Sequence, residues 1–178
     1  MLSRKRTTFL AFSVLAAACG LGDGNLSLRL DGEVGAREGL PIVHEHEGSG
    51  THAHAEFSDA WQVSFDRYLV SLRALEVGHS SGEVGFTSEG TYVYDLSIDI
   101  PEVELVSLAS QRWDRFGFEV SAPLEGEPLW LGDEVTEADA ELMRLSGATH
   151  LIEGHAHHPE TGRERSFTFV VDAPVRAT

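Results

Sequence analysis

The chain of 178 residues contains one cysteine, Cys19, and two methionines, Met1 and Met143. An intrachain disulfide therefore cannot form, and a methionine-rich site for Cu(I) is excluded. Lysine occurs only at position 5, and 13 basic residues stand against 29 acidic ones. Because binding to nucleic-acid phosphates needs a basic face, this composition excludes a nucleic-acid binder. It also argues against electrostatic binding to anionic lipid surfaces.

The N-terminal apolar run is too short to span a bilayer, which takes about 20 residues. It covers residues 7–18 and follows three basic residues at positions 4–6. A basic start, a short apolar run and a series of small residues are typical of an export signal that is removed after translocation. We therefore expect residues 1–18 to be a signal peptide.

The end of this segment, Leu15-Ala16-Ala17-Ala18-Cys19-Gly20, resembles the lipobox of bacterial lipoproteins. The likeness covers residues 1–20, with Ala16 where leucine is usual and Leu15 one place early. It implies that Cys19 is lipidated, with palmitate among its acyl chains, and becomes the mature N-terminus that anchors the protein in the membrane. Gly20 after the cysteine implies the outer membrane, facing the periplasm or the cell surface. Ordinary cleavage is the alternative, because residues 16–18 also fit the A-x-A rule.

Beyond the signal, the length predicts one domain over residues 25–178, joined to the lipid anchor by a tether at residues 19–24. Removal of residues 1–18 leaves ten basic and 29 acidic residues, a net charge of −19. A field of this sign attracts cations.

Alternating apolar residues predict many short strands separated by turns, first around Leu26 and most clearly from Trp61 onward. The alternation slips by one residue at Asp66-Arg67, which predicts a β-bulge or a bend. A helix is expected over about 137–145, capped by Thr136 and ended by Gly147. A C-terminal hairpin follows, with strands over 148–157 and 166–171. This pattern indicates an all-β, antiparallel β-sandwich with one short helix before the hairpin.

Eight of the nine histidines lie in two windows, and the second coincides with the first strand of that hairpin. Strand alternation places Glu153, His155 and His157 on one face, expected to be the outer one. Same-face Cβ atoms lie about 6.6–7 Å apart, which lets two imidazoles converge on one ion. The triplet is therefore a candidate metal site with Glu153 as an oxygen ligand. H-x-H is a loose motif, and an exposed polar strand face is the alternative.

The first window holds four histidines and three glutamates within thirteen residues and has no helical or strand periodicity, so we expect an exposed loop. It resembles the histidine- and acid-rich loops of some periplasmic zinc-handling proteins, a likeness of composition alone. The candidate ligands are His44, His46, His52 and His54. The alternative is a solvated loop without a bound ion.

Imidazole with carboxylate suits Zn(II), Cu(II), Ni(II) or iron, and no thiolate remains once Cys19 is lipidated. The sequence therefore predicts an exported, lipid-anchored protein that binds a transition metal for delivery, storage or sensing. If the two windows meet, four to six imidazoles share one site. Protein partners are not indicated.

Two alternatives stay open. A metal-dependent hydrolase would use His155 and His157 with Glu153 or Glu160 as base, but no motif with a known mechanism is present and no catalytic residue is assigned. A structural or carbohydrate-binding envelope module would carry incidental histidines and use its three tryptophans for sugar stacking, although core packing explains those at least as well.

Overall fold

The computed structural model describes residues 23–30, 32, 34–40, 43–46, 50–53 and 59–177, with the backbone alone described at 43–46 and 50–53. The expected signal peptide, Cys19, residues 20–22 of the tether and His54 lie outside this range.

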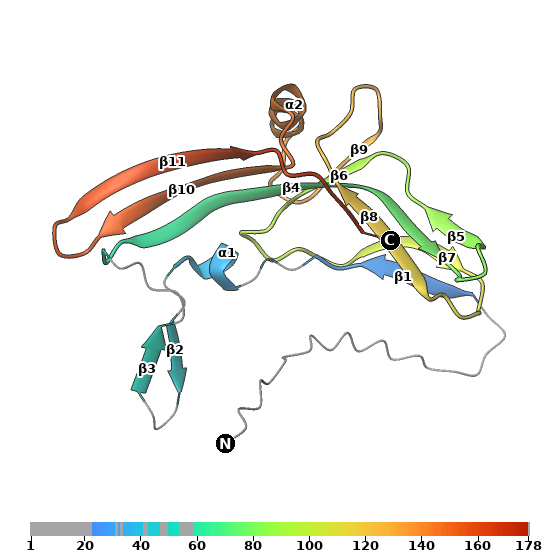
Figure 1. Cartoon of the computed structure of the whole chain (residues 1–178), viewed down its shortest axis with the longest axis horizontal. Coiled ribbons are helices and arrows are strands. Elements are labelled where there is room, and N and C mark those ends of the chain that lie inside the picture. The colour runs from blue at the N-terminus through green and yellow to red at the C-terminus, as the bar shows by residue number, and fades with distance from the viewer. Residues whose placement is uncertain are drawn as a thin grey trace, which may run out of the picture.

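The described chain is all-β, with two helices among its strands, which confirms the predicted fold class (Figure 1). The strands are β1 Gly24–Leu28, β2 Val43–His46, β3 Gly50–Ala53, β4 Gln62–Gly78, β5 Val84–Thr87, β6 Thr91–Asp95, β7 Val103–Leu108, β8 Arg115–Val120, β9 Leu129–Leu131, β10 His150–His158, β11 Arg163–Val171 and β12 Val175–Ala177. The helices are α1 Val34–Glu38 and α2 Glu137–Ser146. Helix α1 adds to the single helix that the sequence predicts.

The main sheet has eight strands and is built on β4, the longest of them. Its order is β11-β10-β4-β6-β9, with β5 and β8 also paired to β4 and β12 paired to β8. Only β9 runs parallel to its neighbour, β6; the other named pairs are antiparallel. A two-stranded sheet, β1-β7, forms the second layer, and β2 and β3 form a separate hairpin.

The hairpin of β2 and β3 corrects the prediction of a loop over the first histidine window. Five of its eight residues are polar, and the others do not alternate with them, so no period-two pattern marks these strands in the sequence. Backbone pairing between two short strands does not require such a pattern.

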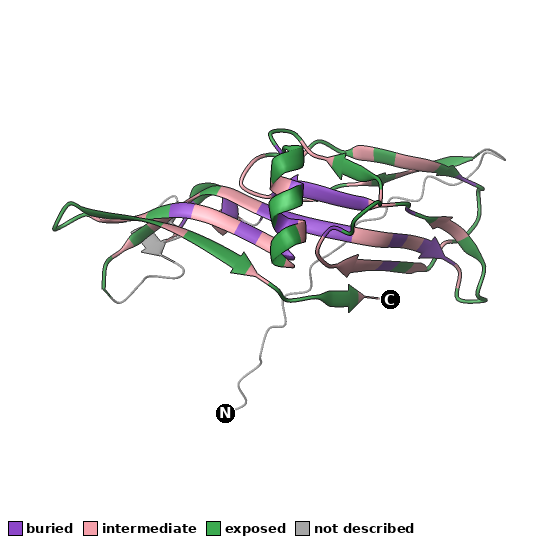
Figure 2. Ribbon diagram, turned by 90° about the horizontal axis from the view of Figure 1, so that it is seen from above, coloured by how far each residue is buried: buried purple, intermediate pink, exposed green. Residues whose placement is uncertain are grey.

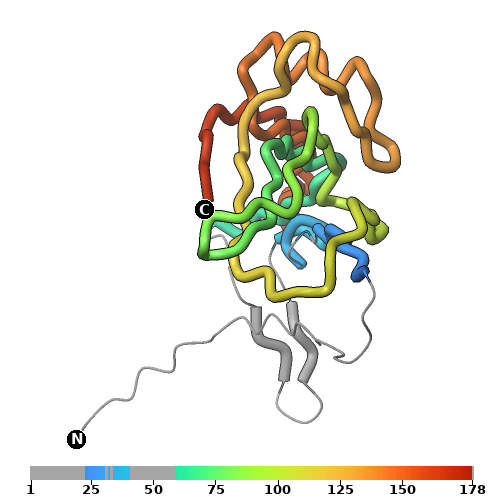
Figure 3. Tube along the Cα trace, turned by 90° about the vertical axis from the view of Figure 1, so that its right-hand side faces the viewer, coloured from blue at the N-terminus to red at the C-terminus, as the bar shows by residue number. Residues whose placement is uncertain are grey.

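Both faces of the main sheet carry a core, one on each side of β4. Figure 3 shows the layers, with β1 (blue) on one side of β4 and the segment that contains α2 (orange) on the other. One core lies between the main sheet and the β1-β7 sheet and centres on Val70, Leu72 and Tyr92. The other lies between the main sheet and α2 and contains Leu69 and Met143, both fully buried. Helix α2 crosses the buried middle of the strands in Figure 2. Because successive side chains of β4 point to opposite faces of the sheet, β4 contributes residues to both cores.

Three strands extend past these cores as an arm, visible at the left of Figure 1. We define the arm as residues 62–66 of β4, 154–158 of β10 and 163–167 of β11. The β10-β11 register runs without a shift from His150 opposite Val171 to His158 opposite Arg163, which confirms the predicted hairpin. Its second strand begins three residues earlier than expected.

Helix α2 follows its local sequence closely. The Thr136 hydroxyl accepts from the Asp139 N–H while the Asp139 carboxylate accepts from the Thr136 N–H, a complete capping box. Gly147 ends the helix at φ 68°, a conformation that favours glycine. The predicted helix, its cap and its end are confirmed to within one residue.

Asp139 also ties α2 to the sheet, because Arg67 on β4 donates to its carboxylate with N–O distances of 2.5 and 2.7 Å. Glu153 lies 3.8 Å from the same guanidinium. The hydrogen bond from Arg67 is the main reason that the Asp139 pKa falls from 3.8 to about 2. The helix is thus held to the sheet by a charged contact as well as by apolar packing.

Asp139→Asn should lower the free energy of unfolding by about 2 kcal/mol at pH 7. The folded-state pKa lies below the ordinary value, so this stabilisation is complete above pH 4 and is lost as pH falls toward 2. Urea unfolding across this pH range measures it, with Glu137→Gln in the same turn as control. A difference from wild type that persisted undiminished at pH 2 would contradict the prediction.

Candidate functional site

The candidate site begins at an extra residue in β4. Glu153 pairs with Arg67 and Gly154 pairs with Phe65, so Asp66 has no partner position on β10. This register shift confirms the predicted bulge. Gly154 is buried opposite the bulge, where an added Cβ would lie 2.7 Å from the Phe167 ring and would also collide with a backbone carbonyl of β4.

The bulge places the Asp66 carboxylate against His155. The imidazole Nδ1 lies 3.2 and 3.3 Å from the two carboxylate oxygens. An ionised carboxylate only accepts hydrogen bonds, so Nδ1 carries a proton in this contact and, in the neutral ring, Nε2 keeps its lone pair. Carboxylates orient metal-binding histidines in this way. Sequence reasoning did not assign Asp66 a role, although the slip in alternation at this residue marked its position.

Glu153, His155 and His157 follow one another at alternate positions of β10 and share a face, as expected. The expectation that this whole face is an outer one is wrong at its start, because Leu151 is only 1% exposed beneath α2. The face is accessible further along the strand. The Glu153 side chain is 37% exposed and the His155 side chain is 49% exposed. Helix α2 ends at Ser146, four residues before β10 begins, but the sequence gave no sign of which face of β10 it would cover.

The three predicted ligands have different neighbours. Glu153 lies near Arg67 and is thereby connected to the ion pair under α2, whereas His155 contacts Asp66. His157 is partly buried and pairs with Gln62 on β4 and Glu164 on β11. The structure therefore brings an imidazole and a carboxylate together at His155, with His157 two residues further along.

The remaining two histidines of β10 lie on the opposite face, which contacts apolar residues as predicted. The His150 Nδ1 lies 2.9 Å from the Thr149 hydroxyl, its ring is edge-on to Tyr68, and burial lowers its pKa. His158 packs edge-on against Trp61 with ring centroids 5.4 Å apart. Its Nδ1 is buried without a hydrogen-bond partner among the described residues.

The first histidine window lies in the β2-β3 hairpin as far as it is described. The backbone register sets His44 opposite His52. Just before this segment, Leu40 and Val63 exchange two backbone hydrogen bonds of 2.7 Å, and Val63 pairs with Ala156 of β10. The segment that contains the first window is therefore anchored beside the strand that contains the second.

Within the part of the chain whose side chains are described, histidine, aspartate and glutamate form no cluster of three or more able to hold a metal ion. The pair of Asp66 and His155 is the nearest approach to such a cluster on the predicted face. A metal there would need a further ligand brought by rotation of neighbouring side chains or by another segment.

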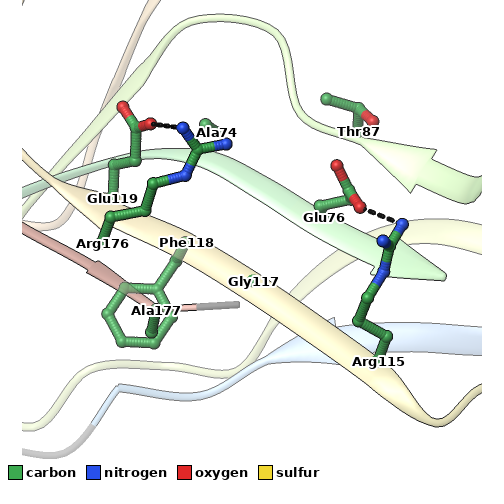
Figure 4. A pocket seen from close by; sticks show the side chains of 9 residues that line it. All are labelled: Ala74, Glu76, Thr87, Arg115, Gly117, Phe118, Glu119, Arg176 and Ala177. Atoms are coloured by element: carbon green, nitrogen blue, oxygen red, sulfur yellow. Dashed lines mark hydrogen bonds and ion pairs between the residues drawn. The ribbon is translucent and has the colours of Figure 1, made fainter. Parts of the chain in front are cut away.

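A pocket of about 160 Å³ lies elsewhere, between β4, β8 and β12 (Figure 4). It contains two ion pairs, Arg115 with Glu76 at 2.5 Å and Arg176 with Glu119 at 3.5 Å. Each positive charge is matched by a negative one, so the pocket offers no excess charge to a ligand ion.

The tryptophans do not form a common platform. Trp61 packs on His158, Trp113 lies against Gly85, and Trp130 stacks on Tyr92 with centroids 6.3 Å apart. Trp130 alone of the three is more than half exposed. A sugar-stacking surface built from all three, as the carbohydrate alternative would need, is not present.

No protein-family model, curated protein or solved structure matches the chain. Among the described residues, neither helix is long and apolar enough to cross a membrane. What the protein does is therefore inferred from the geometry of its own residues.

Gly154→Ala should destabilise the fold by about 1–3 kcal/mol, because the added methyl group overpacks the space between the bulge and Phe167. Thermal unfolding measures the loss, and Gly126→Ala serves as control for a glycine where an added Cβ meets nothing within 4 Å. Since Gly126 has φ 79°, its own replacement costs only local backbone strain. An unchanged melting temperature for Gly154→Ala would show that the bulge adapts.

Proposed function

We propose that this protein is an exported, lipid-anchored envelope protein that binds a transition metal ion for delivery, storage or sensing. The contact between Asp66 and His155 is the observation that supports it most directly. It fixes the ring orientation and the tautomer that a metal-binding imidazole needs, on an accessible strand face.

His157 is the natural second ligand. It lies two positions along the same face, where Cβ atoms stand about 6.6–7 Å apart and two imidazole nitrogens can approach one ion at about 2.0–2.1 Å. Glu164 is paired with His157 across the hairpin and offers a carboxylate on the same face. Glu153 remains a candidate, but it joins the ion only by turning away from Arg67.

The first window can bring further imidazoles to the strand site, because its segment is attached to β4 close by. Leu40 is held on Val63, and His44 follows four residues later, so chain length alone keeps its Cα within about 14 Å of that anchor. His46, His52 and His54 are further candidate ligands in the same segment. A second segment of this kind would complete a coordination shell that the strand face only begins.

Zn(II), Cu(II) and Ni(II) are the ions that suit imidazole and carboxylate ligands, and lipidation of Cys19 would leave the chain without a thiolate. Without residues 1–18 the net charge of −19 raises the local concentration of cations. Neither property selects among the three metals.

The full chain, stripped with chelator and titrated by calorimetry, should bind at least one of these ions more tightly than about 10 μM. His155→Ala and His157→Ala should each weaken binding by at least about tenfold, since each removes a ligand. Asp66→Ala should weaken it by about 10–100-fold through loss of the carboxylate that orients His155.

His79→Ala is the matched control, because His79 lies in the turn between β4 and β5 and contacts Ser81 instead. Replacement of all four histidines of the first window tests the tether separately. Absence of binding tighter than about 10 μM rejects the metal hypothesis. Affinity unchanged in both His155→Ala and His157→Ala rejects the strand site and leaves the first window.

Lipidation is tested apart from metal binding. Cys19→Ser should move the protein from the membrane fraction to the soluble fraction of the envelope, because it removes the acylated thiol. Ala18→Gly serves as a control that keeps the cysteine. Retention of the Cys19→Ser protein in the membrane fraction would contradict a lipid anchor.

A further inference from the structure

The outer edge of β11 is the longest unpaired strand edge in the described part of the chain. β11 has nine residues and pairs with β10 on one side, and no other described strand pairs with it. The opposite end of the sheet is β9, which has only three residues. A long open edge presents a row of backbone donors and acceptors to any strand that can align with it.

β11 carries charged side chains only at its first three residues and otherwise lacks the features that usually keep edge strands apart. It contains no proline and no lysine, and its register with β10 has no bulge. Residues 166–171 are uncharged, with two phenylalanines and two valines, and Phe169 and Val170 are 55% and 51% exposed on opposite faces. Phe167 and Phe169 stack at 5.0 Å as an apolar stripe along one face.

The strand is suited to pairing with itself. A two-fold axis normal to the sheet makes two copies of β11 antiparallel and keeps the same face of each on the same side. Phe167 is the midpoint of β11, and an axis through it pairs all nine residues. Phe167 then lies opposite itself, Arg165 opposite Phe169 of the second copy, and Glu164 opposite Val170 of the second copy.

The charges favour this register over its neighbours. An axis through Thr168 sets Glu164 opposite Asp172, and an axis through Arg165 sets two arginines opposite each other, which destabilises a strand pair. An axis through Ser166 opposes no like charges, but it pairs Val170 and Val171 with turn residues. The axis through Phe167 alone combines full overlap with Arg165 placed on an aromatic ring.

We propose that β11 is a homodimer interface in which two copies join edge to edge about Phe167 into one continuous sheet. The proposal does not require a bound metal ion, although Glu164 is also a candidate ligand of the proposed metal site. It buries mainly backbone hydrogen bonds and a narrow apolar stripe, so the interface is small and the dissociation constant lies in the micromolar range.

The full chain with Cys19→Ser, kept in EDTA to exclude metal bridges, is followed by sedimentation velocity from roughly 5 to 500 μM. Wild-type β11 should show a concentration-dependent shift from monomer to dimer. Val170→Arg should tighten the dimer and Val170→Glu should weaken it, each by roughly 2–30-fold, because residue 170 faces Glu164 of the second copy twice per dimer. Within one copy, residues 164 and 170 are about 20 Å apart along the strand.

Val84→Arg and Val84→Glu are the matched controls, since Val84 is 51% exposed and β5 lies at the opposite end of the molecule from β11 in Figure 1. They change the net charge equally and should leave the dimerisation constant unchanged. Glu164→Arg combined with Val170→Glu should restore dimerisation. A chain that stays monomeric at roughly 500 μM, or equal effects at positions 170 and 84, would overturn the proposal.

Discussion

The pairing of β4 with β10 across the extra residue Asp66 is the constraint on which the rest of the structure depends. On the helix side of this point, side chains of β4 alternate into two cores, one under α2 and one against the β1-β7 sheet, and Leu151 of β10 joins the core under α2. On the other side, the same two strands leave the cores and form the arm. The extra residue shifts the alternation of side chains along β4 by one position. Phe65 and Tyr68 therefore share a face although they are three residues apart.

The bulge has a chemical consequence as well as a packing one. The residue that it leaves without a partner is an aspartate, and its carboxylate contacts His155 on the accessible face. The adjacent residue, Arg67, contacts Asp139 and Glu153 toward α2. Two neighbouring residues of β4 thus have different roles on this face. Arg67 holds the helix through Asp139, and Asp66 contacts the candidate metal ligand His155.

The net negative charge of this protein opposes association between its copies, whereas the open edge of β11 favours it. A strongly acidic chain repels its own copies at long range, an effect that salt screens. The start of β11 carries two arginines and one glutamate, a net positive charge that locally opposes this repulsion. Metal binding on the face of the arm and strand pairing at its edge use the same three strands and share Glu164.

Local sequence determined the features whose causes are local. The capping box at Thr136, the stop at Gly147, the slip at Asp66 and the alternation along β4 and β10 predicted the helix, the bulge, the hairpin and the all-β class. The β2-β3 hairpin was missed because polar residues on both faces leave no periodic signal.

Tertiary structure decided everything that depends on how the elements pack against one another. It placed α2 over Leu151, and so limited the accessible part of the predicted histidine face. It joined Asp66 to His155 across 89 positions of sequence and drew Glu153 toward Arg67. Composition identified imidazole and carboxylate as the available ligands, but only the register between β4 and β10 determines which of them share a site, because strand pairing fixes side-chain neighbours that sequence order does not contain.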